Sequence, residues 1–160
     1  MPKEIERKFL VKTLPFDEAT HPFVNISQGY LALEPGGQEV RLRRKNQQYF
    51  LTVKSIGTMV REEHETSLTL KQFQTLWPGT SGRRLQKDRY IFEDRIEIDI
   101  YRGNLTGLIV AEIEFPDQVS AKSYQAPSWM EQEITHLNFL KNRNLFQFKN
   151  WAAIQDALKA

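Results

Sequence analysis

Apolar and polar residues alternate along most of the chain up to Phe115, and this two-residue period is typical of strands with one buried face. Turn-forming clusters such as Glu34-Pro35-Gly36-Gly37 separate the alternating runs. The pattern predicts strands at residues 5–12, 25–33, 39–45, 49–55, 59–67, 83–92, 95–101 and 108–115.

Helical spacing of apolar residues occurs once within this region and becomes the main pattern after it. Helical intervals separate Leu70, Phe73, Leu76 and Trp77, with Ser67 or Thr69 as the N-cap. Beyond Pro116, helices are expected at 118–121, 129–139 and 151–158. This order predicts one domain over 1–160, of the α+β class but mainly β. We expect an antiparallel sheet of about eight strands, closed or nearly closed into a β-barrel, over about 1–115, with helices packed outside and a mostly helical part over about 116–160.

Composition narrows the classes of function. The 22 Lys and Arg residues nearly balance the 20 Asp and Glu residues, so the net charge of +2 does not favour a nucleic-acid partner. The absence of cysteine excludes thiolate nucleophiles, Fe–S clusters and Cys-ligated zinc. The first residues lack the apolar core of a signal peptide, and no run approaches the length of a membrane span. We therefore expect a cytoplasmic protein without a membrane partner and leave a homodimer open.

The charged residues gather on one face of the expected strands, because alternate residues of a strand share a face. Acids form i, i+2 pairs on three strands, namely Glu4 and Glu6, Glu63 and Glu65, and Glu112 and Glu114. Bases form similar pairs at Arg41 and Arg43 and at Lys87 and Arg89. Like-charged neighbours repel each other unless a partner or ligand compensates them. A charged face that is exposed to solvent would also explain the alternation. A ligand-binding face and a solvated face therefore both stay open as interpretations at this point.

If the helices cover the apolar face, the charged face lines the interior of the barrel. Carboxylates without His or Cys suit Mg²⁺ or Mn²⁺, whereas Arg and Lys bind phosphate oxygens. A short polyphosphate with a divalent cation would compensate both sets of charge. Phosphoryl transfer needs positioning, charge neutralisation and a placed nucleophile, so a water molecule can take the place of a protein nucleophile.

The order of the charged motifs along the chain is also informative. They are Glu4-Ile5-Glu6-Arg7-Lys8, Gln28-Gly29-Tyr30, Val40-Arg41-Leu42-Arg43, Leu51-Thr52-Val53-Lys54, Glu63-x-Glu65, Lys87-x-Arg89-Tyr90, Ile98-Asp99 and Ala111-Glu112-Ile113-Glu114-Phe115. This series resembles the CYTH superfamily, the triphosphate tunnel metalloenzymes, from Met1 to about Phe115. The resemblance is strongest to the short, single-domain bacterial inorganic triphosphatases.

The resemblance implies an eight-stranded antiparallel β-barrel whose interior is a tunnel that binds a triphosphate. The metal ligands that it implies are Glu4, Glu6, Glu112 and Glu114, holding Mg²⁺ or Mn²⁺, with two ions expected. The phosphate-binding residues that it implies are Lys8, Arg41, Arg43, Lys54, Lys87 and Arg89. The catalytic set that it implies is Glu4, Glu6, Lys8, Tyr30, Glu63, Glu65 and Asp99, in which Glu63 and Glu65 hold metal or position the bases and Tyr30 steers the bases or the substrate.

The expected activity is metal-dependent hydrolysis of inorganic tripolyphosphate to pyrophosphate and phosphate. The alternatives within the resemblance are thiamine, nucleoside or RNA triphosphatases and class IV adenylate cyclases. A non-catalytic polyphosphate-binding module is a further alternative, although its binding would not require so many acids. A single-stranded RNA-binding barrel is less favoured, because such barrels place aromatic residues beside their bases.

Several other residues are expected to have structural or surface roles. Arg61, Arg95 and Glu97 have the same strand parity but lie near strand ends, so we expect solvated charges at the rim. His64 should face outward, and the Arg83-Arg84 pair should form a surface patch. Residues 148–158 are expected to pack on the barrel rather than to act as a lid over the tunnel.

Overall fold

The protein is described by a computed structural model over residues 3–56 and 60–160. The strands are β1 (Lys3–Val11), β2 (Val24–Leu33), β3 (Glu39–Lys45), β4 (Gln48–Lys54), β5 (Val60–Leu68), β6 (Arg84–Phe92), β7 (Ile96–Tyr101), β8 (Ile109–Glu114) and β9 (Met130–Glu133). The α-helices are α1 (Leu70–Leu76), α2 (Gln118–Ser123), α3 (Asn142–Leu145) and α4 (Trp151–Lys159), and the 3₁₀ turns are η1 (Trp77–Thr80), η2 (Gly103–Leu105) and η3 (Asn138–Leu140). Each expected strand is present, although Met59, at the start of the fifth, lies outside the described residues.

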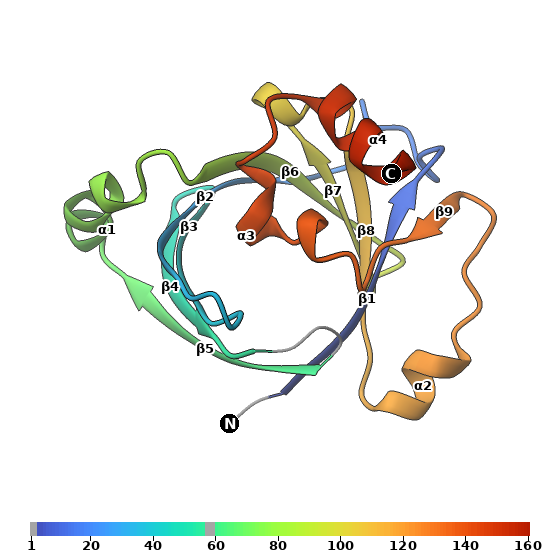
Figure 1. Ribbon diagram of the computed structural model, residues 1–160, viewed down its shortest axis with the longest axis horizontal. Helices are drawn as coiled ribbons and strands as arrows, with labels where there is room; N and C mark the ends of the chain where they lie inside the picture. The colour runs from blue at the N-terminus through green and yellow to red at the C-terminus, as the bar shows by residue number, and fades with distance from the viewer. Residues whose placement is uncertain (1–2, 57–59) are drawn as a thin grey trace.

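The first eight strands form a closed antiparallel barrel, as the sequence predicts (Figure 1). Neighbouring strands follow the order β5-β4-β3-β2-β6-β7-β8-β1-β9, and a further pairing joins β5 to β1. This closing pair places Glu4 of β1 opposite Arg61 of β5. Closure gives every strand an inner and an outer face, so the two-residue period of the sequence becomes a difference between inside and outside.

The outer face of β1, β6, β7 and β8 carries the larger apolar core. On β7, Ile98 and Ile100 are buried on this face, and Ala111 and Ile113 of β8 lie beside them. The chain around α2 covers them, with Ala121 fully buried in the same cluster. Because the apolar residues are used on the outside, the charged residues between them point into the barrel.

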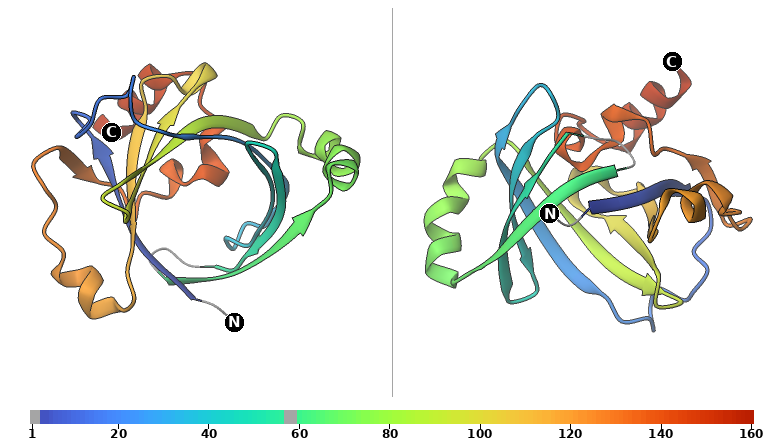
Figure 2. Two further views of the ribbon diagram at one scale, coloured as in Figure 1. Left: turned by 180° about the vertical axis from the view of Figure 1, so that it is seen from behind. Right: turned by 90° about the horizontal axis from the view of Figure 1, so that it is seen from below.

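A second apolar cluster closes one end of the barrel. Tyr101 and Val110, from inner positions of β7 and β8, pack with Leu140, Leu145 and Ile154 of the C-terminal segment. Figure 2 shows that the segment from η3 to α4, coloured orange-red to red, gathers at one end of the ring of strands. No helix within the described residues is long and apolar enough to cross a membrane.

A buried arginine holds this segment to the barrel. Arg143 of α3 donates to the backbone oxygens of Glu34 at 2.5 Å and Gln38 at 3.0 Å, which flank the turn between β2 and β3. The Tyr101 hydroxyl donates to the side chain of Asn142, the first residue of α3. The expected helix at 151–158 is confirmed as α4, whose N-terminus is capped by the Asn150 side chain.

The helix predicted at 129–139 is wrong. Residues Met130–Glu133 form strand β9, and only the short turn η3 follows. The cause is a backbone edge of β1 that β5 leaves open. Within the described residues, strand β5 pairs only with the first residues of β1, so the later residues of β1 pair with β9 on that edge. The Lys12 amide donates to the Trp129 oxygen at 3.1 Å, and the Ile134 amide donates to the Lys8 oxygen at 2.9 Å. Pairing these edge groups outweighs the helical spacing of the side chains.

Candidate functional site

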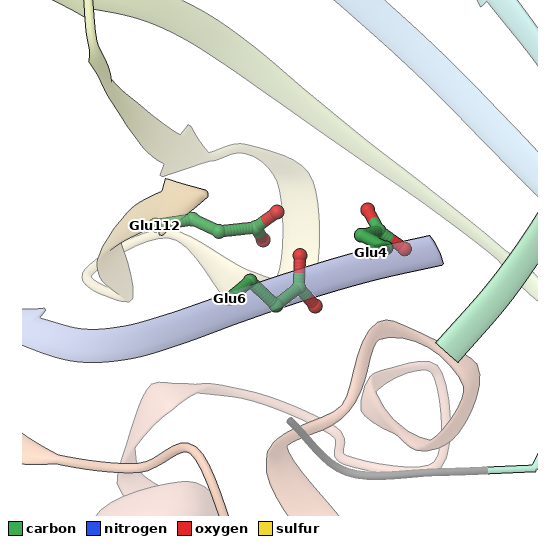
Figure 3. A group of neighbouring side chains, drawn as sticks. All are labelled: Glu4, Glu6 and Glu112. Carbon is green, nitrogen blue, oxygen red and sulfur yellow. The ribbon is translucent and has the colours of Figure 1, made fainter. Parts of the chain in front are cut away.

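Three carboxylates converge on the inner face of the barrel. Glu4 and Glu6 are two residues apart on β1, and Glu112 projects from the adjacent strand β8, as Figure 3 shows. One carboxylate oxygen from each residue lies within 4.8 Å of the others. The strand period and the pairing of β1 with β8 therefore bring together residues that are more than a hundred positions apart.

The protonation of this cluster depends on its crowding. Burial and the neighbouring Glu112 raise the pKa of Glu6 well above its usual value. Burial acts in the same direction on Glu112, but Lys8 and the hydrogen bond from Glu6 outweigh it and hold the pKa of Glu112 well below its usual value. Of the two acids, Glu6 therefore binds a proton more readily and Glu112 keeps its negative charge more readily. Three converging hard oxygen donors fit a divalent cation such as Mg²⁺ or Mn²⁺.

Buried bases cover the inner face of β3, β4 and β6. Arg41, Arg43, Lys54, Lys87 and Arg89 are each at most 9% exposed. The Nε atom of Arg41 is buried and has no hydrogen-bond partner among the described residues. Because buried nitrogen donors are almost always paired, this orphan donor indicates that an acceptor from outside the chain completes the site.

The bases also repel one another. Burial, followed by Arg41 and Arg89, lowers the pKa of Arg43 to about 9. Burial lowers the pKa of Lys87 to about 7, because the attraction of Asp99 does not offset burial together with Arg89 and Arg43. This part of the barrel therefore has an excess of positive charge that a polyanion would compensate.

Asp99 organises two of these bases. Its carboxylate accepts from Arg89 Nε at 2.7 Å and Nη2 at 2.9 Å, and it lies 2.8 Å from Lys87 Nζ. Glu97 takes the remaining nitrogen of Arg89 at 3.0 Å. Arg89, which the resemblance assigns to phosphate binding, thus has all three guanidinium nitrogens engaged by acids of the chain. Lys87 retains donors that can reach a ligand.

Ion pairs connect the carboxylates to the remaining bases. Lys54 Nζ lies 3.3 Å from Glu4 and 3.7 Å from Glu63, and Lys8 Nζ lies 3.5 Å from Glu6 and 3.6 Å from Glu112. The two charge sets therefore adjoin each other, with Lys54 and Lys8 beside the three converging carboxylates. This places bases that can bind phosphate oxygens next to acids that could hold a divalent cation.

Two of the sequence-derived site residues, Glu65 and Glu114, lie apart from the three converging carboxylates, whereas Tyr30 lies in the interior. Glu65 is exposed and accepts from Thr52 at 3.1 Å. Glu114 is exposed and is not among the three converging carboxylates. Tyr30 is fully buried, and its ring lies 6.4 Å from that of Phe146 in the C-terminal segment.

Gln28 is a site residue to which sequence reasoning gave no role. Its side-chain oxygen accepts from Arg43 Nε at 3.1 Å and Nη2 at 2.8 Å, and its amide donates to the Tyr30 hydroxyl at 3.0 Å. The signal was its inner-face position, two residues before Tyr30. An uncharged amide attracts less notice than the charges around it, although it fixes the plane of Arg43.

The expectation that Arg61 is a solvated rim charge is wrong. The side chain is 7% exposed and donates to Glu39 at 3.0 Å. Closure of β5 onto β1 brings Arg61 inward, and the buried Glu39 supplies the charge that makes this burial tolerable. Arg95 and His64 are exposed, as expected, and Glu97 is half-buried beside Arg89.

Comparisons with known proteins agree with this arrangement. A protein named inorganic triphosphatase from Nitrosomonas europaea is 40% identical over 146 residues, which are 89% of this chain and 95% of the relative. Another of that name, from Acetivibrio thermocellus, is 30% identical over 158 residues, covering 94% and 99% of the two chains. The crystal structure of the inorganic triphosphatase NE1496 has a TM-score of 0.68 at 37% identity, covering 94% of this chain and 98% of that one.

The family assignment rests on the length of the match as well as on these relatives. The family model described as the CYTH domain matches residues 2–141, which include the whole barrel and reach η3. The converging carboxylates and the buried bases all lie within the matched residues. The chain therefore belongs to the CYTH domain family.

Proposed function

We propose that this protein is a metal-dependent triphosphatase that hydrolyses inorganic tripolyphosphate to pyrophosphate and phosphate. The observation that carries the proposal is the inner wall, where buried bases with excess positive charge face three converging carboxylates. A polyanion with a divalent cation matches both halves of this wall. The names of the two relatives support the same reaction.

In this proposal the carboxylates hold the cation and the bases hold the phosphates. Glu4, Glu6 and Glu112 bind Mg²⁺ or Mn²⁺, and the further acids Glu114 and Glu63 leave room for a second ion. The bound cation supplies Lewis-acid neutralisation of phosphate oxygens. Phosphate oxygens are bound by Lys8, Arg41, Arg43, Lys54 and Lys87. Arg89 contributes through Nη1, which has a second hydrogen besides the one that it donates to Glu97.

The reaction needs no protein nucleophile. A water oxygen forms a bond to a terminal phosphorus and gives up a proton to solvent, the bridging P–O bond breaks, and pyrophosphate leaves with the charge that the bases neutralise. Glu63 is assigned to positioning the water and Lys54, and Glu65 to positioning Arg41 through Thr52. Asp99 is assigned to holding Lys87 and Arg89, and Tyr30 to steering Arg43 through Gln28. We place the enzyme in the cytoplasm, which is consistent with its lack of cysteine. Light scattering measures its oligomeric state and distinguishes a monomer from a homodimer.

Substrate choice is tested by phosphate release from tripolyphosphate, ATP and thiamine triphosphate, each with Mg²⁺, Mn²⁺ or EDTA. The proposal predicts the fastest release from tripolyphosphate and none in EDTA. Faster release from ATP or thiamine triphosphate would reassign the substrate, and cyclic AMP from ATP would indicate a cyclase. Tight binding of tripolyphosphate without any release would indicate a binding module.

The metal assignment is tested by Glu6→Gln, which removes a ligand charge at nearly constant size. Its matched control is Glu131→Gln, since Glu131 is exposed on β9. Mn²⁺ binding, measured by calorimetry without substrate, should weaken by about tenfold or more in Glu6→Gln and be unchanged in the control. Equal Mn²⁺ affinity in the two variants would remove Glu6 from the metal site.

A further inference from the structure

A second cavity lies on the outside of the barrel wall, away from the charged interior. Its volume is about 440 Å³, and its lining includes Trp77, Arg84, Gln86, Arg102, Phe146 and Phe148. This volume is within the usual range for small-molecule sites. None of the carboxylates or bases assigned to the tunnel lines it. Arg84 and Gln86 alternate with the inward-facing Lys87, so they belong to the opposite face of β6.

One wall of this cavity is the end of a stack of flat side chains. The ring of Tyr49 lies 5.0 Å from that of Phe73, and the ring of Phe73 lies 5.0 Å from that of Trp77, which it meets in a stacked arrangement. The Arg84 guanidinium carbon lies 4.5 Å from the centre of the Trp77 ring. Trp77 and Arg84 both line the cavity, so the Arg84 end of this series of contacts borders the open space.

Hydrogen bonds hold this last layer in place. Arg84 Nε donates to the Thr80 hydroxyl and Nη2 donates to the Trp77 backbone oxygen, each at 2.9 Å. Gly29 lets η1 approach β2 closely enough for this, because a Cβ there would lie 2.6 Å from Thr80 atoms. The guanidinium plane is therefore fixed before any ligand arrives, which reduces the entropy that binding would cost.

The charge of Arg84 is uncompensated, in contrast to that of Arg102 across the cavity. Arg102 forms ion pairs with Asp88 at 2.9 Å and Glu18 at 2.8 Å. Among the described residues, Arg84 makes no ion pair, and its Nη1 has no hydrogen-bond partner. A fixed, unpaired guanidinium provides a plane on which a base can stack and an edge that can bind a phosphate.

We propose that this cavity binds a nucleotide, with the base stacked on Arg84 and its phosphate bound by the free edge of that guanidinium. Ser27, Gln86 and Asn104 supply hydrogen-bonding groups for the base, and Phe146 and Phe148 supply apolar contact. This site is separate from the tunnel and does not depend on the triphosphatase proposal. It gives the exterior of the barrel a small-molecule site of its own.

The test titrates the protein with AMP in EDTA, first without tripolyphosphate and then with tripolyphosphate present to fill the tunnel. Binding is measured by calorimetry and by the change in tryptophan fluorescence. Adenosine and inorganic phosphate, each of which carries one half of the ligand, should bind at least about tenfold more weakly than AMP. Arg84→Gln should weaken AMP binding about tenfold, and Arg84→Lys should do so as well because it keeps the charge but loses the plane.

The matched control is Arg95→Gln. Arg95 is also exposed and lies 5.1 Å from the centre of the Phe115 ring, but it does not line this cavity. The control should bind AMP as the wild type does, and both Arg84 variants should retain tripolyphosphate hydrolysis if the wild type has it. Three outcomes would overturn the proposal: no AMP binding at millimolar concentration, displacement of AMP by tripolyphosphate, or wild-type affinity in both Arg84 variants.

Discussion

At the scale of single residues, the site consists of charges whose neighbours determine what they can do. Arg43 is aligned by Gln28, and Arg89 is held by Asp99. The strand period placed the bases on one face from sequence alone, because parity depends only on counting along the chain. It could not identify Gln28 as the group that aligns Arg43, since that contact crosses from β2 to β3 and requires their register.

Removal of the Gln28 amide tests this alignment. In Gln28→Leu, Arg43 loses both hydrogen bonds and its guanidinium is no longer held in one orientation. We expect the KM for tripolyphosphate to rise by about tenfold and kcat to change less. Gln132→Leu is the control, because Gln132 is exposed on β9. Wild-type steady-state kinetics in Gln28→Leu would show that Arg43 needs no alignment.

The lowered pKa of Lys87, about 7, has two consequences. Between about pH 7 and the usual lysine value the unfolded chain binds more protons than the folded one, so this group's contribution to stability rises with pH across that window. A bound triphosphate favours the charged amine, so binding near about pH 8 should take up protons.

Proton uptake is measured by titrating tripolyphosphate in EDTA in two buffers that differ in ionisation enthalpy. Because both the buffer and the ligand titrate in this range, the quantity of interest is the difference between wild type and Lys87→Met. The variant should take up about one proton fewer at most. Identical uptake by the two proteins would mean that Lys87 is already charged before binding.

At the scale of elements, backbone pairing determined whether a segment became a helix or a strand where side-chain spacing alone did not. The spacing over 151–158 predicts α4 correctly, because its apolar residues pack on the second core and Asn150 caps its start. Similar spacing over 129–139 is misleading, because those residues meet the open edge of β1. A sequence pattern describes the faces of an element but contains no information about a vacant edge elsewhere in the fold.

The packing of α4 is tested by Ile154→Ala. Ile154 is fully buried in the second core, and the substitution should lower the free energy of unfolding by about 2–4 kcal/mol. The same change at Ile56, which is 60% exposed, should cost less than about 0.5 kcal/mol. Chemical denaturation measures both. A small effect at Ile154 would indicate that α4 is a loosely held lid.

The turn between β6 and β7 contains Glu93 and Asp94, whose φ angles of 54° and 55° lie in the left-handed region. Glycine adopts this conformation without the steric cost of a Cβ. Asp94→Gly should therefore raise the free energy of unfolding by up to about 1 kcal/mol. Asp156→Gly, inside α4, should lower it by about 1 kcal/mol. Destabilisation by both variants would mean that the Asp94 side chain makes a contribution larger than the strain.

At the scale of the whole molecule, the near-neutral composition conceals a strong separation of charge. Closing the strands into a barrel turns the charged face inward, where acids from β1 and β8 meet bases from β3, β4 and β6. The sequence was sufficient to predict the barrel and most of its inward-facing charges, but not the inward position of Arg61. It could not predict which acids converge, because Glu112 joins Glu4 and Glu6 while Glu114 on the same strand does not.

The most direct test of the triphosphatase claim follows tripolyphosphate by ³¹P NMR with Mg²⁺ for the wild type, Glu6→Gln and Arg43→Gln. The wild type should produce pyrophosphate and phosphate in equal amounts. Glu6→Gln should be inactive at every substrate concentration, whereas Arg43→Gln should regain turnover as the tripolyphosphate concentration rises. No products from the wild type, or undiminished products from both variants, would contradict the assignment of the inner wall as a triphosphate site.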